Sequence, residues 1–126
     1  MICCHVNDTD EKAQEAGKAI LWRMYHAGRP PREYMSPPGH VTLPPPTATP
    51  RSRRKGLDVQ TYEELQENYH LVVGSPDTVI KKLRYIKERL GIGSLMLEAQ
   101  SGPLSHKDTM HALELFGKEV IPALKD

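Results

Sequence analysis

Hydrophobic positions follow two patterns along the chain, one typical of buried strands and one typical of amphipathic helices. Residues 2–6 and 94–99 are short runs with an apolar core, and such runs favour strands that are covered on both faces of a parallel sheet. Three longer segments repeat apolar residues every three or four positions, which predicts helices with one apolar stripe each. These helices are expected at residues 10–27, 76–90 and 106–121, with stripes formed by Ala13, Ala16, Ile20, Met24 and Ala27, by Val79, Leu83, Ile86 and Leu90, and by Met110, Leu113, Phe116, Gly117 and Val120.

Polar residues and glycines mark the boundaries of the first helix and of a further short one. Asp8 and Glu11 have the spacing of an N-cap and its N3 partner, and Gly28 is placed to end that helix. Thr61 and Glu64 form a capping box in front of a short helix.

The two later helices have equally clear boundaries. Ser75 is a favourable N-cap and is followed by Pro76 at the first helical position, while Gly91 is placed to end the helix. Ser105 caps the last helix, and Pro122 is expected to end it.

Strands that alternate with amphipathic helices predict parallel βα units. Between the helices, residues 29–60 have no hydrophobic period and hold eight of the eleven prolines, and residues 70–73 form a short extended piece. We therefore predict an α/β fold, a partial β/α (TIM-type) barrel of about two βα units with a long proline-rich insertion. Residues 1–28 form one βα unit, residues 29–60 the insertion, and residues 61–126 a helix plus the terminal βα unit, all within one domain.

Such a sheet is too small to close on itself. A complete barrel of this type has eight strands and roughly 250 residues, whereas the chain has 126 residues and two convincing strands. Strands without a neighbour tend to pair with another chain. The chain is therefore expected either to associate with identical copies, as a homo-oligomer, or to be part of a longer protein.

Charge and composition exclude several classes of protein. The 17 Lys and Arg residues nearly balance the 16 Asp and Glu residues, which argues against a dedicated nucleic-acid binder. No apolar run approaches the roughly 20 residues that cross a bilayer, and the first residues do not have the pattern of a signal peptide. The two cysteines, Cys3 and Cys4, are adjacent and cannot form a disulfide framework, which indicates a reducing compartment and a cytoplasmic location.

Several motifs occur in a fixed order along the chain: HVNDTDEKA at residues 5–13, VGSPDTV at 73–79, the predicted strand at 94–98, GPLSH at 102–106, and LELF and VIP at 113–116 and 120–122. Together they resemble the C-terminal end of the luciferase-like flavin-dependent monooxygenases. The resemblance covers residues 2–27 and 71–124.

The resemblance implies an eight-stranded β/α barrel that uses FMN, or a deazaflavin in some branches, to oxidise a small organic substrate. This chain would supply only the last two βα units and the insertion between them. The resemblance therefore implies a fragment or truncated member of the family without independent activity. The alternative is a non-catalytic α/β oligomerisation or binding module.

Candidate site residues follow from the position of barrel active sites at the carboxyl ends of the strands. Glu98, Gln100, Ser101 and Gly102 follow the last predicted strand and are the candidate cofactor-binding residues. The competing interpretation is an ordinary turn from strand to helix in which Gly102 serves backbone geometry. His106, at the start of the last helix, is the candidate general acid or base.

Two further groups have weaker signals. Gly74 and Ser75 precede a helix and could hold a phosphate, but capping explains them better, and a barrel is expected to place them at its amino, non-catalytic face. Cys3 and His5 share one face of a strand while Cys4 lies on the other. Two ligands are too few for a zinc site, so no metal is predicted.

Overall fold

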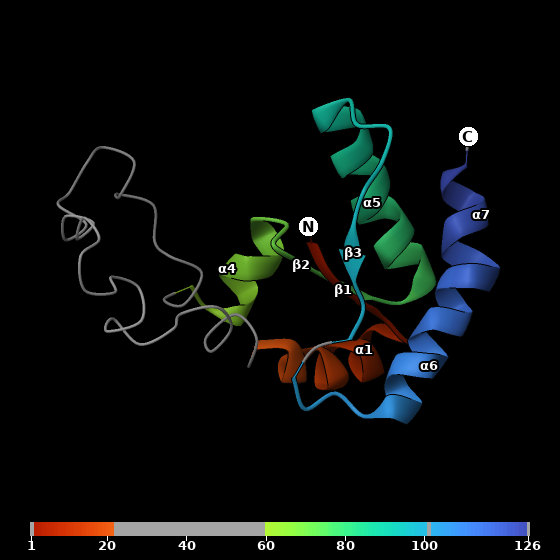
Figure 1. Cartoon of the computed structure of the whole chain (residues 1–126). Helices are drawn as coiled ribbons and strands as arrows, with labels where there is room; N and C mark the ends of the chain where they lie inside the picture. Colours follow the sequence, from red (N-terminus) through yellow and green to blue (C-terminus); the bar gives the residue numbers. More distant parts are fainter. Residues whose placement is uncertain (1, 22–59, 101, 126) are drawn as a thin grey trace, which may run out of the picture.

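The described part of the chain, residues 2–21, 60–100 and 102–125 of the computed structural model, has an α/β fold with helices on both faces of a parallel sheet (Figure 1). The predicted proline-rich insertion, the end of the first helix near Gly28, and Ser101 lie outside the described residues.

The sheet has β1 (Ile2–Val6) at its centre, with β2 (Leu71–Gly74) on one side and β3 (Leu97–Glu98) on the other. Both neighbours run parallel to β1. The prediction that the first and last strands are parallel is confirmed, and they are direct neighbours. The prediction of only two strands is wrong, because the short extended piece after the capping-box helix pairs with β1 along its whole length.

The helices lie close to their predicted positions. They are α1 (Asp10–Gly17) with a following 3-10 turn η1 (Lys18–Ile20), α4 (Tyr62–Glu67), α5 (Pro76–Leu90), α6 (His106–Leu115), a π-helical turn η4 (Phe116–Val120) and α7 (Ile121–Leu124).

Most helix starts are confirmed, with one correction. Thr61 forms its capping box, Ser75 occupies the N-cap position of α5, and the Ser105 hydroxyl accepts a hydrogen bond from the Asp108 amide. The prediction for α1 is wrong by one residue: Thr9 is the N-cap, and its hydroxyl accepts from the Lys12 amide. Asp8 is thereby left outside the helix, and its carboxylate bonds elsewhere.

Helix ends follow the sequence in one case and not in another. Gly91 ends α5 in the left-handed conformation (φ 59°), as predicted. Pro122 does not end the last helix, which continues to Leu124. The proline lies in the first turn of α7, after the π-helical turn, where a missing N–H is tolerated.

Two hydrophobic clusters lie on opposite faces of the sheet. One face of β1 contributes Cys4 and Val6, which pack with α5, α6 and η4, and the other face contributes Cys3, which packs with α1, η1 and α4. The strand period therefore separates the two cysteines as the sequence predicted.

The last strand and the last helix are less buried than predicted. Only Leu97 and Glu98 form the strand, while Leu95 and Met96 are 37% and 70% exposed. In the final helix Phe116 and Val120 are buried, but Met110 and Leu113 are exposed. The expectation of burial on both faces is wrong here because, among the described strands, β3 has a neighbour on one side only.

Candidate functional site

The order of the strands creates a crevice at the carboxyl edge of the sheet. The connection after β1 leads to α1 on one face, whereas the connection after its neighbour β3 leads to α6 on the other face. Neighbouring strands whose connections diverge in this way form a switch point, where open α/β sheets bind ligands. A pocket of about 560 Å³ lies there, lined by Asn7, Asp8, Lys12, Glu15, Ala16, Lys107, Asp108 and His111.

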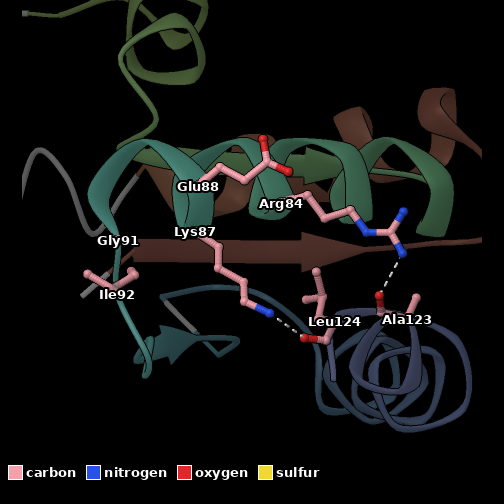
Figure 2. Close-up of a pocket in the computed structure, with 7 residues that line it drawn as sticks. All are labelled: Arg84, Lys87, Glu88, Gly91, Ile92, Ala123 and Leu124. Atoms are coloured by element: carbon pink, nitrogen blue, oxygen red, sulfur yellow. Dashed lines mark hydrogen bonds between the residues drawn. The ribbon is translucent and has the colours of Figure 1, made fainter. Parts of the chain in front are cut away.

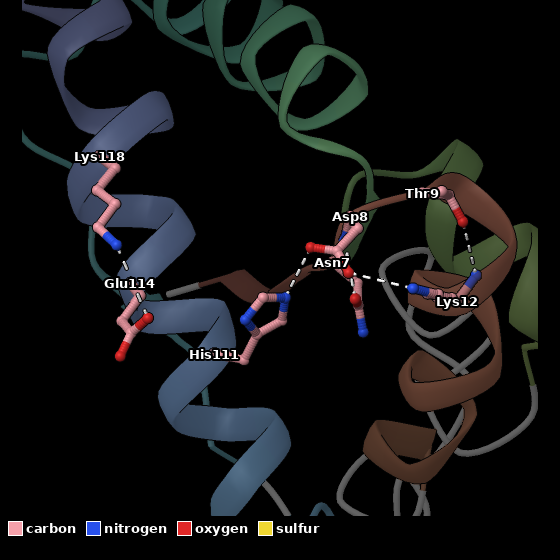
Figure 3. A network of polar contacts seen from close by, with 7 residues as sticks. All are labelled: Asn7, Asp8, Thr9, Lys12, His111, Glu114 and Lys118. Atoms are coloured by element: carbon pink, nitrogen blue, oxygen red, sulfur yellow. Dashed lines mark hydrogen bonds and ion pairs between the residues drawn. The ribbon is translucent and has the colours of Figure 1, made fainter.

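A polar network crosses this pocket (Figure 3). Asp8 Oδ1 accepts a hydrogen bond from His111 Nε2 at 2.8 Å, and Asp8 Oδ2 accepts from Lys12 Nζ at 3.2 Å. The hydrogen bond from His111, followed by that from Lys12, holds the pKa of Asp8 below its ordinary value. Since Nε2 donates to the carboxylate, Nδ1 of a neutral His111 ring is the basic nitrogen. The pair therefore has the arrangement of an imidazole base oriented by a carboxylate.

A second carboxylate connects the carboxyl ends of β1 and β2. Asp10 Oδ1 accepts from the Ser75 backbone N–H at 2.6 Å, and Asp10 Oδ2 accepts from the Thr78 hydroxyl at 3.1 Å. The Ser75 amide is the main reason why the pKa of Asp10 is lowered. The expected amino-face position of Gly74 and Ser75 is therefore wrong, because β2 ends at Gly74 and places them at the carboxyl edge. Ser75 occupies the N-cap position, but its hydroxyl bonds Thr78 Oγ1 and caps no helix amide. The Asp10 carboxylate accepts the Ser75 amide instead.

His5 lies directly beneath this edge. It is on β1, two residues before Asn7, and residues two apart on a strand share a face. Its side chain is fully buried, and neither ring nitrogen has a hydrogen-bond partner in the described structure. Burial lowers its pKa, Asp108 opposes that effect, and His111 adds to it. A buried polar group without a partner is rare in folded proteins and often marks a water, a ligand or a functional position.

The residues predicted from sequence do not line this pocket. Glu98 is partly exposed and accepts a weak hydrogen bond from the Cys3 thiol at 3.8 Å, while Gln100 and His106 are exposed. Gly102 is exposed with φ 56°, in the left-handed region that favours glycine. The backbone interpretation of Gly102 is therefore confirmed, and Ser101 lies outside the described residues.

Sequence reasoning missed Asp8, Lys12 and His111 as members of one site. A signal was available for Asp8, because it follows a predicted parallel strand almost directly and so had to lie at the carboxyl edge. His111 had no such signal. It is placed by the packing of α6, one turn beyond the predicted candidate His106.

The described lining of the pocket does not fit a flavin ring. Of its eight residues only Ala16 is apolar, and the rest carry charges, an imidazole or an amide. Ligand pockets for large aromatic groups are mainly apolar. Nor do any three His, Cys, Asp or Glu side chains within residues 2–21, 60–100 and 102–125 form a group that could hold a metal ion.

A second pocket, of about 430 Å³, lies between α5 and α7 (Figure 2). Arg84 Nη2 donates to the Ala123 carbonyl at 2.7 Å, and Lys87 Nζ donates to the Leu124 carbonyl at 3.1 Å. Both cations bond the last carbonyls of α7, which is a structural capping role. This second pocket is near the end of α5. Since α5 leads away from the carboxyl edge, the pocket lies far from the switch point.

Comparisons with known proteins add no relative: no protein-family model matches the chain, and no curated protein matches it. In the described part of the chain, no helix combines the length and the apolar character that a membrane span requires.

Proposed function

We propose that this chain is a fragment or truncated member of the luciferase-like flavin-dependent monooxygenases that has no turnover on its own. The observation that carries the proposal is the direct parallel pairing of β1 and β3, the two strands that the resemblance assigns to successive barrel units. Successive strands are neighbours in a β/α barrel. In this proposal β2 occupies the edge where an earlier barrel strand would lie. A barrel has its helices in one outer ring, whereas α1 and α6 lie on opposite faces of the sheet here. The proposal therefore requires α1 to lie on the outer face in a complete barrel.

The retained part of the parent site is the carboxyl edge that holds Asp8 and His111. The carboxylate orients the ring, and His111 Nδ1 is positioned to exchange a proton with a small organic substrate in the pocket. FMN or a deazaflavin would supply the redox chemistry in a complete barrel. The remaining strands would have to provide the flavin contacts, because the lining present here does not fit the ring. We also propose a cytoplasmic location, because the two adjacent cysteines, Cys3 and Cys4, cannot form a disulfide framework.

Titration of the purified protein with oxidised FMN, followed by fluorescence quenching, tests the absence of an independent site. We expect no saturable quenching at micromolar protein. Saturable binding that is lost in His111→Ala would contradict the proposal, because it would show a self-sufficient flavin site.

The DNA upstream of the coding sequence tests the kinship itself. We expect a reading frame, intact or interrupted, that encodes earlier βα units of the same barrel. Upstream DNA with no such coding capacity would remove the support for a truncated enzyme.

A second candidate function is a non-catalytic α/β module that assembles with identical copies. The observation that favours it is the exposure of Leu95 and Met96 immediately before an edge strand. Open edges and exposed apolar residues of this kind mark surfaces that associate. A mass measurement in solution tests this function, with an oligomer expected.

A further inference from the structure

We infer that the outer flank of β3 and α6–α7 is a dimer interface for a second copy of this chain, arranged about a two-fold axis. The inference rests on the second proposed function and identifies the surface that carries it. That surface consists of Met110, Leu113, Gly117 and Ile121 on the helices and Leu95 beside the strand. These five residues are called the flank surface.

The helical part of the flank surface is one continuous stripe. Its members follow one another at intervals of three, four and four residues, so they share one side of the helix. Met110, Leu113 and Ile121 are 44%, 46% and 50% exposed. Gly117 lies between them without a side chain, and a Cβ atom at that position would have open space around it.

The stripe is on the side of the outer β3 edge, which no described strand covers. Leu115 and Glu119 line a small pocket together with Ser75, Pro76 and Asp77, so their side of the helix faces the start of α5. Leu113 and Gly117 are each two residues from Leu115, which is roughly 200° around a helix. They therefore face away from α5. Since α5 packs on β2 and α6 packs on β1, that direction is the side of β3.

The stripe is self-complementary when two copies run antiparallel. Leu113 then lies opposite Gly117 of the second copy, where no side chain obstructs it, and Met110 lies opposite Ile121. A two-fold interface requires this kind of reciprocal match. The same axis also sets the two β3 strands antiparallel, so their edges can pair beside Leu95.

The charges beside the stripe fit the same arrangement. Glu114 and Lys118 border it and form an exposed pair at 3.9 Å within the helix. Figure 3 shows both side chains pointing away from the Asp8–His111 network. In the antiparallel dimer Glu114 of each copy lies opposite Lys118 of the other, so the two-fold axis produces two pairs of opposite charges. A parallel arrangement would place like charges together.

Light scattering on the full chain tests the inference first. We expect twice the monomer mass of 14.2 kDa at micromolar concentration. Leu113→Glu is expected to raise the dimer dissociation constant at least about tenfold, the size of effect seen for residues at the centre of an interface. Lys81→Gln is the matched control, since it changes the net charge by the same amount on the exposed side of α5 and should leave the dimer intact.

Cysteine cross-linking tests the register. Cys3 and Cys4 are buried, so single cysteines introduced on the surface report the interface. A mixture of Leu113→Cys and Gly117→Cys chains should form a mixed disulfide dimer faster than either variant alone. Gly117→Cys has open space for its side chain, and circular dichroism of each variant checks that it is folded.

Each outcome decides a different point. A monomer at micromolar concentration would overturn both the oligomeric function and the flank surface. A dimer that persists in folded Leu113→Glu would keep the oligomeric function and overturn the flank surface. Preferential self-cross-linking of Gly117→Cys would replace the antiparallel arrangement by a parallel one and overturn the register.

Discussion

Asp8 Oδ1 and His111 Nε2 lie 2.8 Å apart although 103 positions separate the two residues in the sequence. Asp8 follows the central strand and His111 lies on the helix that follows the edge strand. Their hydrogen bond therefore connects the two chain segments that diverge from the switch point. It forms because the N-cap of α1 is Thr9, which leaves the Asp8 carboxylate outside the helix.

Acid should weaken this connection. The pKa of Asp8 is lower in the folded protein than its ordinary value of 3.8, so its contribution to stability is present above that pH and is lost as the pH falls through the folded value. We expect Asp8→Asn to lower the melting temperature at neutral pH by a few degrees at most, because exposed ion pairs contribute little. The difference from the unsubstituted protein should shrink below pH 3.8, as measured by thermal unfolding across an acid series. A constant difference at all pH values would show that Asp8 acts by something other than its charge.

Asp10→Asn should lower the free energy of unfolding more than the loss of an ordinary carboxylate at a helix start does. Asp10 accepts the Ser75 amide and the Thr78 hydroxyl across 65 and 68 positions of sequence, and its pKa is lowered, so its contribution is present above the ordinary value of 3.8. We expect the free energy of unfolding to fall by about 1 kcal/mol, because a hydrogen bond to a charged group contributes less where solvent reaches it. Urea denaturation at neutral pH measures it. Asp77→Asn is the control, since it removes a carboxylate from the first turn of α5; equal losses in the two variants would contradict the tertiary role of Asp10.

His5→Leu should stabilise the protein. The imidazole is fully buried and neither nitrogen is bonded, and an unsatisfied buried group costs about 1–3 kcal/mol. The pKa of His5 is lowered from its ordinary value of 6.5, so the folded state resists protonation while the unfolded state takes up a proton as the pH falls below that value. The unsubstituted protein should therefore lose stability as the pH falls below 6.5, and the variant should lose less. Lower stability of His5→Leu in urea titrations would instead show that the ring nitrogens hold a partner in solution.

Gly17→Ala should destabilise the protein, contrary to helix propensity. Alanine is normally better than glycine inside a helix by roughly 1 kcal/mol. At this position, however, a Cβ atom would lie 2.6 Å from Tyr62 Oη and 2.9 Å from Val73 Cγ1. We expect a net loss of about 1–3 kcal/mol from overpacking. Gly93→Ala, with nothing within 4 Å of the added carbon, should change chemical denaturation very little. A stabilised Gly17→Ala variant would show that α1 can move away from β2 without cost.

The sequence was informative wherever a local cause acts. The capping box at Thr61, the Ser75–Pro76 start and the left-handed Gly91 were each predicted from residues within one turn, and the structure confirms them. The predicted N-cap role of Asp8 was wrong, and its carboxylate instead bonds His111, which is distant in the sequence. The predicted helix end at Pro122 was also wrong, because the π-helical turn before it places the proline in the first turn of a new helical segment.

The candidate site shows the same division. The sequence by itself determined the first strand, most helix starts and the parallel direction of the first and last strands, because apolar period and capping chemistry act over a few residues. Only the tertiary structure decided that β3 lies beside β1 and not beside β2. This order brings His111 to Asp8 and, among the described strands, leaves the outer edge of β3 without a neighbour. The physical reason is that strand order depends on which edge and which faces are covered together. That is a property of the whole packed sheet, and no short stretch of residues contains it.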